Sequence, residues 1–283
     1  MKILITGANG FTGRHFAAHA SAAGHDIVAL QADLTDKDAL HDEVRRIAPD
    51  AVVHLAAISF VGHANLGAFY TVNVVGTTHL LDALAQLPTA PHRVLIASSA
   101  NVYGNSDQSP LAETHPAAPV NHYAMSKLAM EYMTRTYAER LNIVITRPFN
   151  YTGHGQNVNF LIPKLAKHFA ERASVVALGN LDVEREFNDV QLVCDAYMAL
   201  LSSGQPGEIY NVCSGHPYTL REIIATFEAI TGHRMDIEVN PAFVRKNEVH
   251  RLCGNPDKLN HLLHTNNISL NVPTLRETLA RML

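Results

Sequence analysis

The chain has 283 residues, of which 47% are hydrophobic and 17% are charged, and its formal net charge is -4. That length suits one large domain or two closely associated ones, and the slight negative charge argues against a nucleic-acid partner, which needs a basic surface. The three cysteines are widely spaced, so we expect neither a disulfide framework nor a bound metal.

The first segment predicts a strand that leads into a glycine-rich turn. Residues 3–5 are apolar but form too short a run for a signal peptide or a membrane span, so we expect a cytoplasmic protein with no membrane partner. Gly7, Gly10 and Gly13 follow, before a helix expected to end near Gly24. Glycines at this spacing allow a tight turn and close approach of the backbone to a pyrophosphate. The order strand, turn, helix therefore predicts a dinucleotide site.

A second strand is expected over residues 26–30, and its end bears on how the adenosine ribose is bound. In NAD-specific sites an acidic residue at this place binds the ribose hydroxyls. Here residues 30–32 are Leu, Gln and Ala, and the first carboxylate is Asp33. Arg14, directly after the glycine turn, could pair with an extra phosphate. We therefore predict that NADPH is accepted at least as well as NADH.

Further along, strands and helices alternate. Leu40, Val44 and Ile47 mark one face of a helix that Pro49 ends. Strands are expected over residues 51–55, 93–97 and 143–146, one helix contains Asn73, and another runs from Tyr123 to about Leu141. This alternation predicts an α/β fold with a doubly wound parallel sheet.

The alternation breaks after residue 150. The rest of the chain mixes helices with short strands, and two sequences beginning at Thr219 and Thr274 fit the capping box that starts a helix. We predict a dinucleotide-binding domain over residues 1–150, to which about 181–213 partly returns, and a smaller mixed α/β substrate domain over 151–283.

Two signals in the middle of the chain predict the chemistry. Tyr123 and Lys127 are four residues apart, so they lie on one face of a helix. The ammonium is expected to lower the pKa of the tyrosine from its reference of about 10 and to make it a usable acid or base. Such pairs also arise by chance on solvated helices, but here Ser98 and Ser99 lie upstream and the glycine turn opens the chain.

Over nearly its whole length the chain resembles an extended short-chain dehydrogenase/reductase. The residues that carry the resemblance are Thr6-Gly7-x-x-Gly10-x-x-Gly13, His54-Leu55-Ala56-Ala57, Asn73, Ser98-Ser99 before Val102-Tyr103-Gly104, Tyr123-x-x-x-Lys127 and Arg147-Pro148-Phe149-Asn150. Segments 179–190, 210–215 and 245–249 are similar to the branch of GDP-mannose 4,6-dehydratases and GDP-4-keto-6-deoxymannose reductases. The resemblance implies a Rossmann sheet, NADP(H) or NAD(H) as cofactor, and a nucleotide-sugar substrate, with a GDP-linked sugar favoured.

The resemblance also implies roles for individual residues. Tyr123 would exchange a proton with the sugar oxygen, Lys127 would lower its pKa and hold the nicotinamide ribose, and Ser99 would bond the same oxygen. The implied cofactor contacts are Gly7, Asn9, Gly10, Phe11, Thr12, Gly13, Arg14, Asp33, Leu34, Leu55, Ala56, Ala57, Asn73, Ser98, Tyr123, Lys127 and Pro148. The implied substrate contacts are Ser59, Ser99, Asn101, Tyr123, Asn150, Asn159, Phe160, Lys164, Arg185, Arg245 and Glu248. Asp33 would belong to an adenine-contacting segment. Arg185 and Arg245 would contact the diphosphate, although each could instead form a surface ion pair.

Asn101 separates the reactions that this family performs. The 4,6-dehydratases carry a glutamate at this position, because elimination of water needs a base there, and GDP-fucose synthases carry a cysteine. Asn101 can serve as neither, whereas Ser99, Tyr123 and Lys127 suffice for hydride transfer at one carbon.

We therefore predict an NAD(P)H-dependent reductase of the C4 ketone of a nucleotide-activated 4-keto-6-deoxyhexose. The favoured reaction converts GDP-4-keto-6-deoxymannose to GDP-rhamnose or GDP-6-deoxytalose. A nucleotide-sugar 4-epimerase uses the same three residues and stays open. So does a non-catalytic relative that binds the cofactor as a sensor or scaffold, although such relatives typically lose the tyrosine or the lysine.

The resemblance further implies a homodimer that pairs through the Asn73 helix and the Tyr123 helix. Apolar side chains recur at helical spacing on both, and they are Leu80, Leu84 and Leu87 on the first and Met130, Met133 and Tyr137 on the second. The alternative is that these side chains face their own sheet.

Overall fold

In the computed structural model, which describes residues 1–61, 63–181, 183–241 and 250–283, six strands form one parallel sheet in the order β10-β5-β4-β3-β1-β2. The strands are β1 (Lys2–Thr6), β2 (Asp26–Ala29), β3 (Ala51–His54), β4 (Arg93–Ala97), β5 (Ile143–Pro148) and β10 (Ile209–Val212). Their near-continuous apolar runs are typical of strands that are buried on both faces. The predicted fold class is confirmed.

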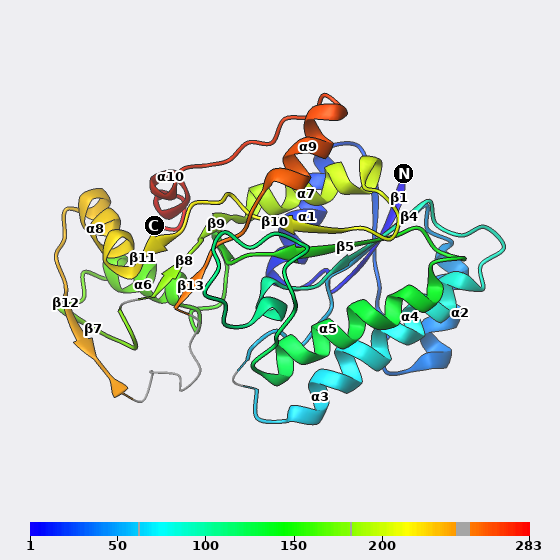
Figure 1. The fold of residues 1–283 in the computed structure, drawn as a ribbon, viewed down its shortest axis with the longest axis horizontal. Helices are drawn as coiled ribbons and strands as arrows, with labels where there is room; N and C mark the ends of the chain where they lie inside the picture. Colours follow the sequence, from blue (N-terminus) through cyan, green and yellow to red (C-terminus); the bar gives the residue numbers. More distant parts are fainter. Residues whose placement is uncertain (62, 182, 242–249) are drawn as a thin grey trace.

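Helices cover both faces of this sheet (Figure 1). The helices above it in this view are α1 (Phe11–Ala22), α7 (Val190–Ser203) and α9 (Asp257–Thr265). Those below it are α2 (Lys37–Ile47), α3 (Leu66–Tyr70), the π-helical turn η1 (Thr71–Gly76), α4 (Thr77–Ala85) and α5 (His122–Thr134). Two 3-10 turns, η2 (Ala100–Tyr103) and η3 (Arg135–Tyr137), flank α5 in the sequence. The two layers bury separate apolar clusters, one centred on Phe16 and Tyr197 and the other on Leu4 and Leu80.

The strand order places the candidate site. The chain leaves β1 for β2 on one side and continues with β3 on the other, so the order reverses at β1. Ligands of open parallel sheets bind at such a reversal, beyond the carboxyl ends of the strands. The glycine turn after β1, the loop after β3, Ser98 and Ser99 after β4, and Phe149 after β5 therefore gather at one edge.

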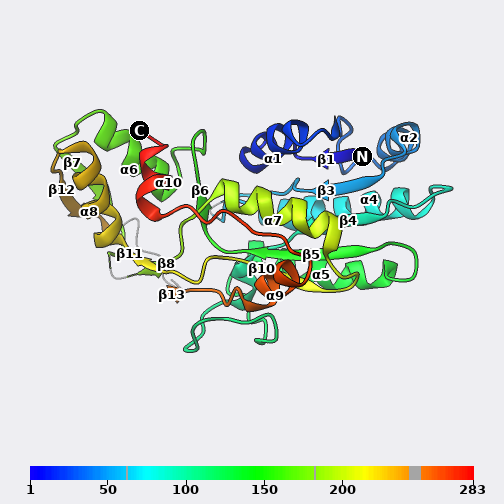
Figure 2. The ribbon, with the colours of Figure 1, turned by 90° about the horizontal axis from the view of Figure 1, so that it is seen from above.

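A second group of elements extends the molecule at one end (Figures 1 and 2). It holds α6 (Leu161–Ala170), α8 (Leu220–Thr231), α10 (Leu275–Ala280), β6 (Tyr151–Thr152), β7 (Val175–Leu178), β8 (Glu184–Arg185), β9 (Asn188–Asp189), β11 (Tyr218–Thr219), β12 (Asp236–Val239) and β13 (Arg251–Leu252). The three helices pack with β7 around Phe169 and Phe227. Both predicted capping boxes are confirmed, at Thr219 and Thr274. The division at residue 150 stays a prediction.

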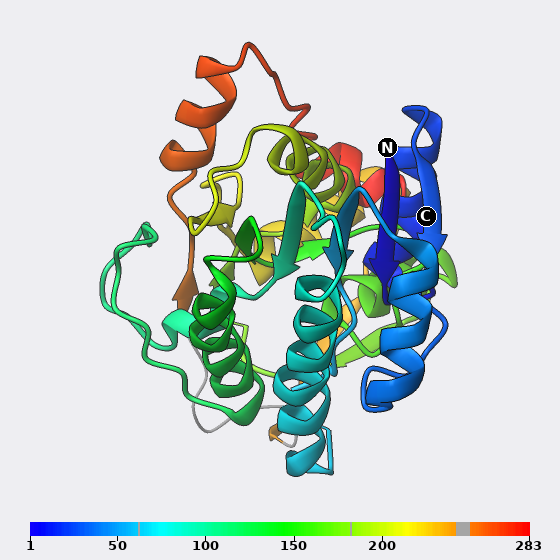
Figure 3. The same cartoon turned by 90° about the vertical axis from the view of Figure 1, so that its right-hand side faces the viewer.

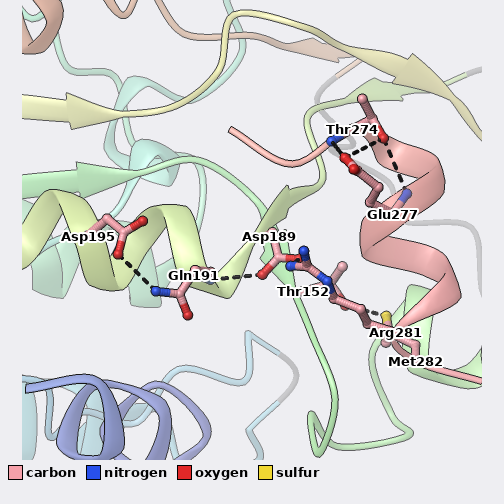
Figure 4. A network of polar contacts seen from close by, with 8 residues as sticks. All are labelled: Thr152, Asp189, Gln191, Asp195, Thr274, Glu277, Arg281 and Met282. Carbon is pink, nitrogen blue, oxygen red and sulfur yellow. Dashed lines mark hydrogen bonds and ion pairs between the residues drawn. The ribbon is translucent and has the colours of Figure 1, made fainter. Parts of the chain in front are cut away.

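The C-terminal helix is tied to the segment that leads back to the main sheet (Figure 4). Arg281 Nη1 lies 3.0 Å from the buried Asp189 Oδ2, while Asp189 Oδ1 accepts the Gln191 N–H that begins α7 at 2.8 Å. Gln191 then donates from its side chain to Asp195 at 2.8 Å. One buried carboxylate thus connects the end of the chain to the start of α7.

The expected end of helix α5 needs correction. Helix α5 ends at Thr134 and passes into a 3-10 turn, short of Leu141, and the Thr134 hydroxyl takes up the carbonyl of Glu131 at 2.7 Å. Such local side-chain bonds compete with the helical pattern. No helix in the described ranges is long and apolar enough to cross a membrane.

The apolar side chains proposed for a dimer face turn inward instead. Leu80, Leu84 and Met130 are fully buried in the core below the sheet, and Leu87, Met133 and Tyr137 pack against it. The prediction that these side chains form the dimer contact is therefore wrong. The same pair of helices, side by side in Figure 3, exposes other apolar residues, namely Val75, Met125 and Tyr132.

Candidate active site

Helix α5 begins where β4 ends, which brings the tyrosine and the lysine to the serines. Asn121 caps the helix by accepting the Ala124 N–H at 2.9 Å. Tyr123 in the first turn and Lys127 in the second are 8% and 3% exposed, and Lys127 Nζ donates to the Ala97 carbonyl at 2.8 Å. The structure thus brings together the predicted catalytic residues.

The electrostatics of this pair differ from the expectation. Burial raises the pKa of Tyr123 to about 12, and a hydrogen bond with Ser99 opposes that rise. The net shift is thus opposite to the expected lowering, because the effect of burial is the largest. Burial also lowers the pKa of Lys127 to about 8, against the attraction of Glu131. The phenol of Tyr123 therefore keeps its proton at neutral pH.

Glu131 and Arg147 form a buried ion pair one turn beyond Lys127. Arg147 Nε and Nη2 donate to the two carboxylate oxygens at 2.9 and 2.6 Å, and Ser98 Oγ donates to the first of them at 2.5 Å. The guanidinium lies 4.8 Å from the centre of the Tyr103 ring. Bidentate pairs of this kind fix geometry as well as charge. Ser98 is therefore held toward α5, and its predicted contact with the cofactor stays a prediction.

A buried hydrogen-bond chain links the glycine turn to this region. The Thr77 hydroxyl donates to the Asn73 carbonyl at 2.7 Å, so it must accept from His54 Nε2 at 2.8 Å. His54 Nδ1 then accepts from the Thr6 hydroxyl at 2.7 Å. Burial lowers the pKa of His54 to about 3, which keeps the ring neutral. Thr6 Oγ1 also accepts the backbone N–H of Ala56 at 3.1 Å.

Asn73 continues this chain. Its side chain is fully buried, accepts the Ile58 N–H at 2.9 Å, and donates to the Ile58 carbonyl at 3.2 Å and to Ser126 Oγ at 3.0 Å. The Asn73 side chain thus joins the loop after β3 to helix α5, and its predicted cofactor contact stays a prediction.

The glycine turn fits a pyrophosphate. Gly7 has φ +71°, and a Cβ there would lie 2.7 Å from the Ala56 nitrogen, so the turn passes close to the end of β3. A Cβ at Gly13 would lie 2.2 Å from the Gly7 oxygen. Helix α1 begins without a side-chain cap and without an acidic residue in its first turn. Its first N–H groups and the helix dipole therefore favour an anion.

The segment after β5 crosses to the start of α1, which sequence reasoning missed. Tyr151 OH hydrogen-bonds Thr12 Oγ1 at 2.7 Å, and its ring stacks on Phe11 with centroids 6.1 Å apart. Arg14 donates to the Asn9 carbonyl at 2.6 Å and to the Gly155 carbonyl at 3.2 Å. These bonds use two of the five guanidinium N–H donors of Arg14, and its pairing with a cofactor phosphate stays a prediction.

The end of β2 carries a carboxylate that comes from elsewhere in the sequence. Glu43 on α2 accepts the N–H of Gln31 at 3.1 Å and that of Ala32 at 2.7 Å. Asp33 is exposed and accepts the N–H and the hydroxyl of Thr35, which lowers its pKa. No spacing in the sequence links Glu43 to this place, because the contact depends on how α2 packs.

Several of the predicted substrate residues are exposed or make contacts only with backbone carbonyls. Asn159 and Phe160 are exposed at the start of α6, and Ser59 is exposed after β3. Arg185 on β8 donates to the carbonyls of Glu184 and His250 at 2.9 and 3.0 Å.

The other predicted positions are more enclosed. Lys164 Nζ donates to the Ala177 carbonyl at 2.5 Å, and the carbonyl of Asn150 accepts the Asn188 N–H at 2.9 Å. Pro148 and Leu34 are buried, while Leu55, Ala56 and Ala57 are partly buried. Arg245 and Glu248 lie outside the described residues. All these ligand contacts stay predictions.

The buried ion pair generates a stability prediction. Glu131→Gln keeps the shape of the side chain but leaves the Arg147 charge without its partner, so we expect a loss of about 3–5 kcal/mol in the free energy of unfolding. Glu171→Gln is the matched control, because Glu171 pairs with Lys167 at 3.9 Å on an exposed helix face, where we expect a change of less than about 1 kcal/mol. Urea unfolding of both variants measures this, and equal losses would contradict it.

Comparison with known proteins agrees with this geometry. The chain is 36% identical over 269 residues to GDP-6-deoxy-D-talose 4-dehydrogenase from Aggregatibacter actinomycetemcomitans, covering 93% of this chain and 91% of that protein. It is also 36% identical over 274 residues to GDP-6-deoxy-D-mannose reductase from Pseudomonas aeruginosa, covering 91% and 89%.

Solved structures give the same result. The structure of RMD from Pseudomonas aeruginosa complexed with NADPH superposes with a TM-score of 0.89 at 32% identity, covering 99% of this chain and 96% of that one. A UDP-glucose 4-epimerase from Thermus thermophilus in complex with NAD gives 0.86 at 25% identity, covering 100% and 97%. A family model matches residues 3–213, which is most of the chain, and this confirms the resemblance seen in the sequence. This protein belongs to the NAD dependent epimerase/dehydratase family.

Proposed function

We propose that this enzyme reduces the C4 ketone of a GDP-linked 4-keto-6-deoxyhexose, with NADPH or NADH as the hydride donor. The observation that carries the proposal is the convergence of Ser99, Tyr123 and Lys127 beside Asn101, a residue that cannot remove a proton from carbon. The names of two relatives support it, since both act on GDP-6-deoxyhexoses. One is named for the talose and the other for the mannose configuration at equal identity, so identity does not choose the C4 product.

Each residue has a role in this reaction that follows from its environment. Tyr123, protonated at neutral pH, gives its proton to the C4 oxygen of the substrate. Ser99 lies beside that hydroxyl and bonds the same oxygen. Lys127, as an ammonium, stabilises the phenolate that remains. The bound nicotinamide supplies the hydride, and the uncapped start of α1 would hold its pyrophosphate.

The proposal is tested with purified enzyme, NADPH and GDP-4-keto-6-deoxymannose. We expect equimolar oxidation of NADPH and an NMR spectrum of a GDP-6-deoxyhexose with a C4 hydroxyl. GDP-mannose with NADP should give no 4-keto product, because Asn101 cannot act as the base of a dehydratase. Interconversion of C4 epimers without net consumption of NADPH would instead identify a 4-epimerase. We set the non-catalytic alternative aside, because the chain matches enzymes over more than nine-tenths of its length.

The assignment of Tyr123 makes a first prediction. Tyr123→Phe should lower kcat by about 10²–10⁴-fold, the range of a general-acid contribution, while NADPH binding is retained. Tyr132→Phe, an exposed tyrosine on the same helix, should leave kcat unchanged. Turnover of Tyr123→Phe near the wild-type rate would refute the role.

The pKa of Lys127 makes a second prediction, on pH dependence. Tyr123 remains protonated up to about pH 12, so the loss of the Lys127 proton near pH 8 should limit reduction. We expect kcat/KM to be level below about pH 8 and to fall about tenfold per unit above it. Lys127→Arg keeps its charge at all these pH values and should abolish this fall, whatever its absolute rate. An identical alkaline fall in both proteins would exclude Lys127 as its source.

A third prediction concerns cofactor preference. Gln31 replaces the acidic residue that favours NAD, and the two Glu43 oxygens are already engaged by the amides of Gln31 and Ala32. We expect kcat/KM with NADPH to equal or exceed that with NADH. A hundredfold preference for NADH, about 2.7 kcal/mol, would contradict this. If that preference vanished in Glu43→Gln, the Glu43 carboxylate would be its cause.

We further propose that the enzyme is a homodimer that pairs through α5 and the neighbouring α3–η1 segment. Leu66, Val75, Met125 and Tyr132 are exposed there by 48%, 45%, 44% and 57%. Light scattering at micromolar concentration should give twice the chain mass of 31.0 kDa, and Tyr132→Glu should shift it toward the monomer. A single particle of the chain mass for the unchanged protein would count against the dimer.

We also propose that the protein works in the cytoplasm. Its three cysteines, at positions 194, 213 and 253, are all free and buried. Unpaired thiols are typical of reducing compartments.

A further inference from the structure

The hydroxyl of Ser99 is held in one hydrogen-bonding role. A serine oxygen can accept two hydrogen bonds and donate one. Ser99 Oγ lies 3.2 Å from the backbone nitrogen of Asn101 and 3.1 Å from its Nδ2, and both of these groups donate. Ser99 is 6% exposed, so its surroundings leave little room for water to compete. With both acceptor positions occupied, its proton is left to donate.

The donor direction leads to Tyr123. Ser99 lies two residues beyond β4, where its backbone is extended, and it caps the η2 turn. Tyr123 lies in the first turn of α5. Their hydrogen bond lowers the pKa of Tyr123 against the effect of burial, as a bond donated to the phenol oxygen does. The Ser99 hydroxyl proton therefore points toward the Tyr123 hydroxyl, where the C4 oxygen of the substrate would receive its proton in the proposed reaction.

The η2 turn fixes Asn101 in this position. The Gly104 N–H donates to the Asn101 carbonyl at 3.1 Å, and Val102 and Tyr103, which follow Asn101 in the turn, are fully buried. The Asn101 side chain thus starts from an anchored backbone. A carboxylate of the same shape could only accept, so it would draw the Ser99 proton toward itself and away from Tyr123.

We propose that Asn101 is a positioning residue whose amide fixes Ser99 as a hydrogen-bond donor toward the oxygen that is reduced. The inference rests on the proposed function and deepens it. The sequence predicts Asn101 as a substrate contact. In this proposal Asn101 acts on the reaction by orienting the Ser99 hydroxyl. The proposal also gives a physical reason for a neutral amide at a position where a dehydratase needs a base.

The test compares Asn101→Asp, Asn101→Ala and the control Asn105→Asp, an exposed residue just beyond the same turn. Removing a donor from a charged transition state typically costs about 10²–10³-fold in kcat. We expect Asn101→Asp to lose about that much, because its carboxylate reverses the Ser99 hydrogen bond. Asn101→Ala, which keeps the backbone donor, should lose about tenfold. The KM for NADPH should be unchanged in all three, and Asn105→Asp should match the wild type.

The pH profile separates orientation from packing. As the pH falls, the carboxyl introduced by Asn101→Asp gains a proton and becomes a donor again, so its activity relative to wild type should rise. A packing role predicts the opposite ranking, with Asn101→Ala worse than the isosteric Asn101→Asp and no recovery at low pH. That ranking, or wild-type kcat in Asn101→Asp, would overturn the proposal. If the wild type reduces no 4-keto sugar but interconverts C4 epimers, the proposed function fails, and the same ranking measured on that turnover still tests Asn101.

Discussion

Three buried charged side chains next to Tyr123 constrain the rest of the candidate site. Lys127, Glu131 and Arg147 are each at most 5% exposed, and a buried charge is costly unless it is paired and hydrogen-bonded. Arg147 belongs to β5, while the other two lie on α5, so pairing is possible only when the helix lies across the ends of β4 and β5. That placement sets Tyr123 beside Ser99.

The neutral polar chain from Thr6 to Ser126 serves the other half of the site. It runs through His54, Thr77 and Asn73 and joins the glycine turn, the loop after β3 and helix α5. Buried networks whose members are satisfied specify one arrangement of the elements around them. The turn suited to a pyrophosphate and the helix that carries Tyr123 are thus positioned by common contacts, and any shift of one disturbs the other.

Much of this follows from the sequence, because local patterns determine it. The alternation of apolar strands and amphipathic helices predicts the parallel sheet, and the Tyr123–Lys127 spacing places both side chains on one helix face. The predictions that failed concern properties that depend on burial or on residues distant in the sequence. The helical spacing of Leu80 and Leu84 on α4, and of Met130 and Met133 on α5, indicates apolar faces but not which surfaces these faces contact. The pKa of Tyr123 rises because the fold buries it. The hydrogen-bond partners of Glu43, Glu131 and Tyr151 cannot be predicted from the sequence, because they are distant along the chain.

In the proposed reaction, Ser99, Tyr123 and Lys127 assist a single hydride transfer from the nicotinamide to C4 of the sugar. Its most direct measurement uses NADPH carrying deuterium on the transferred position, GDP-4-keto-6-deoxymannose and NMR of the recovered sugar. The account predicts one deuterium at C4, none at C5 or C6, and one NADPH oxidised per sugar. Deuterium absent from C4, or a changed sugar without oxidation of NADPH, would contradict it.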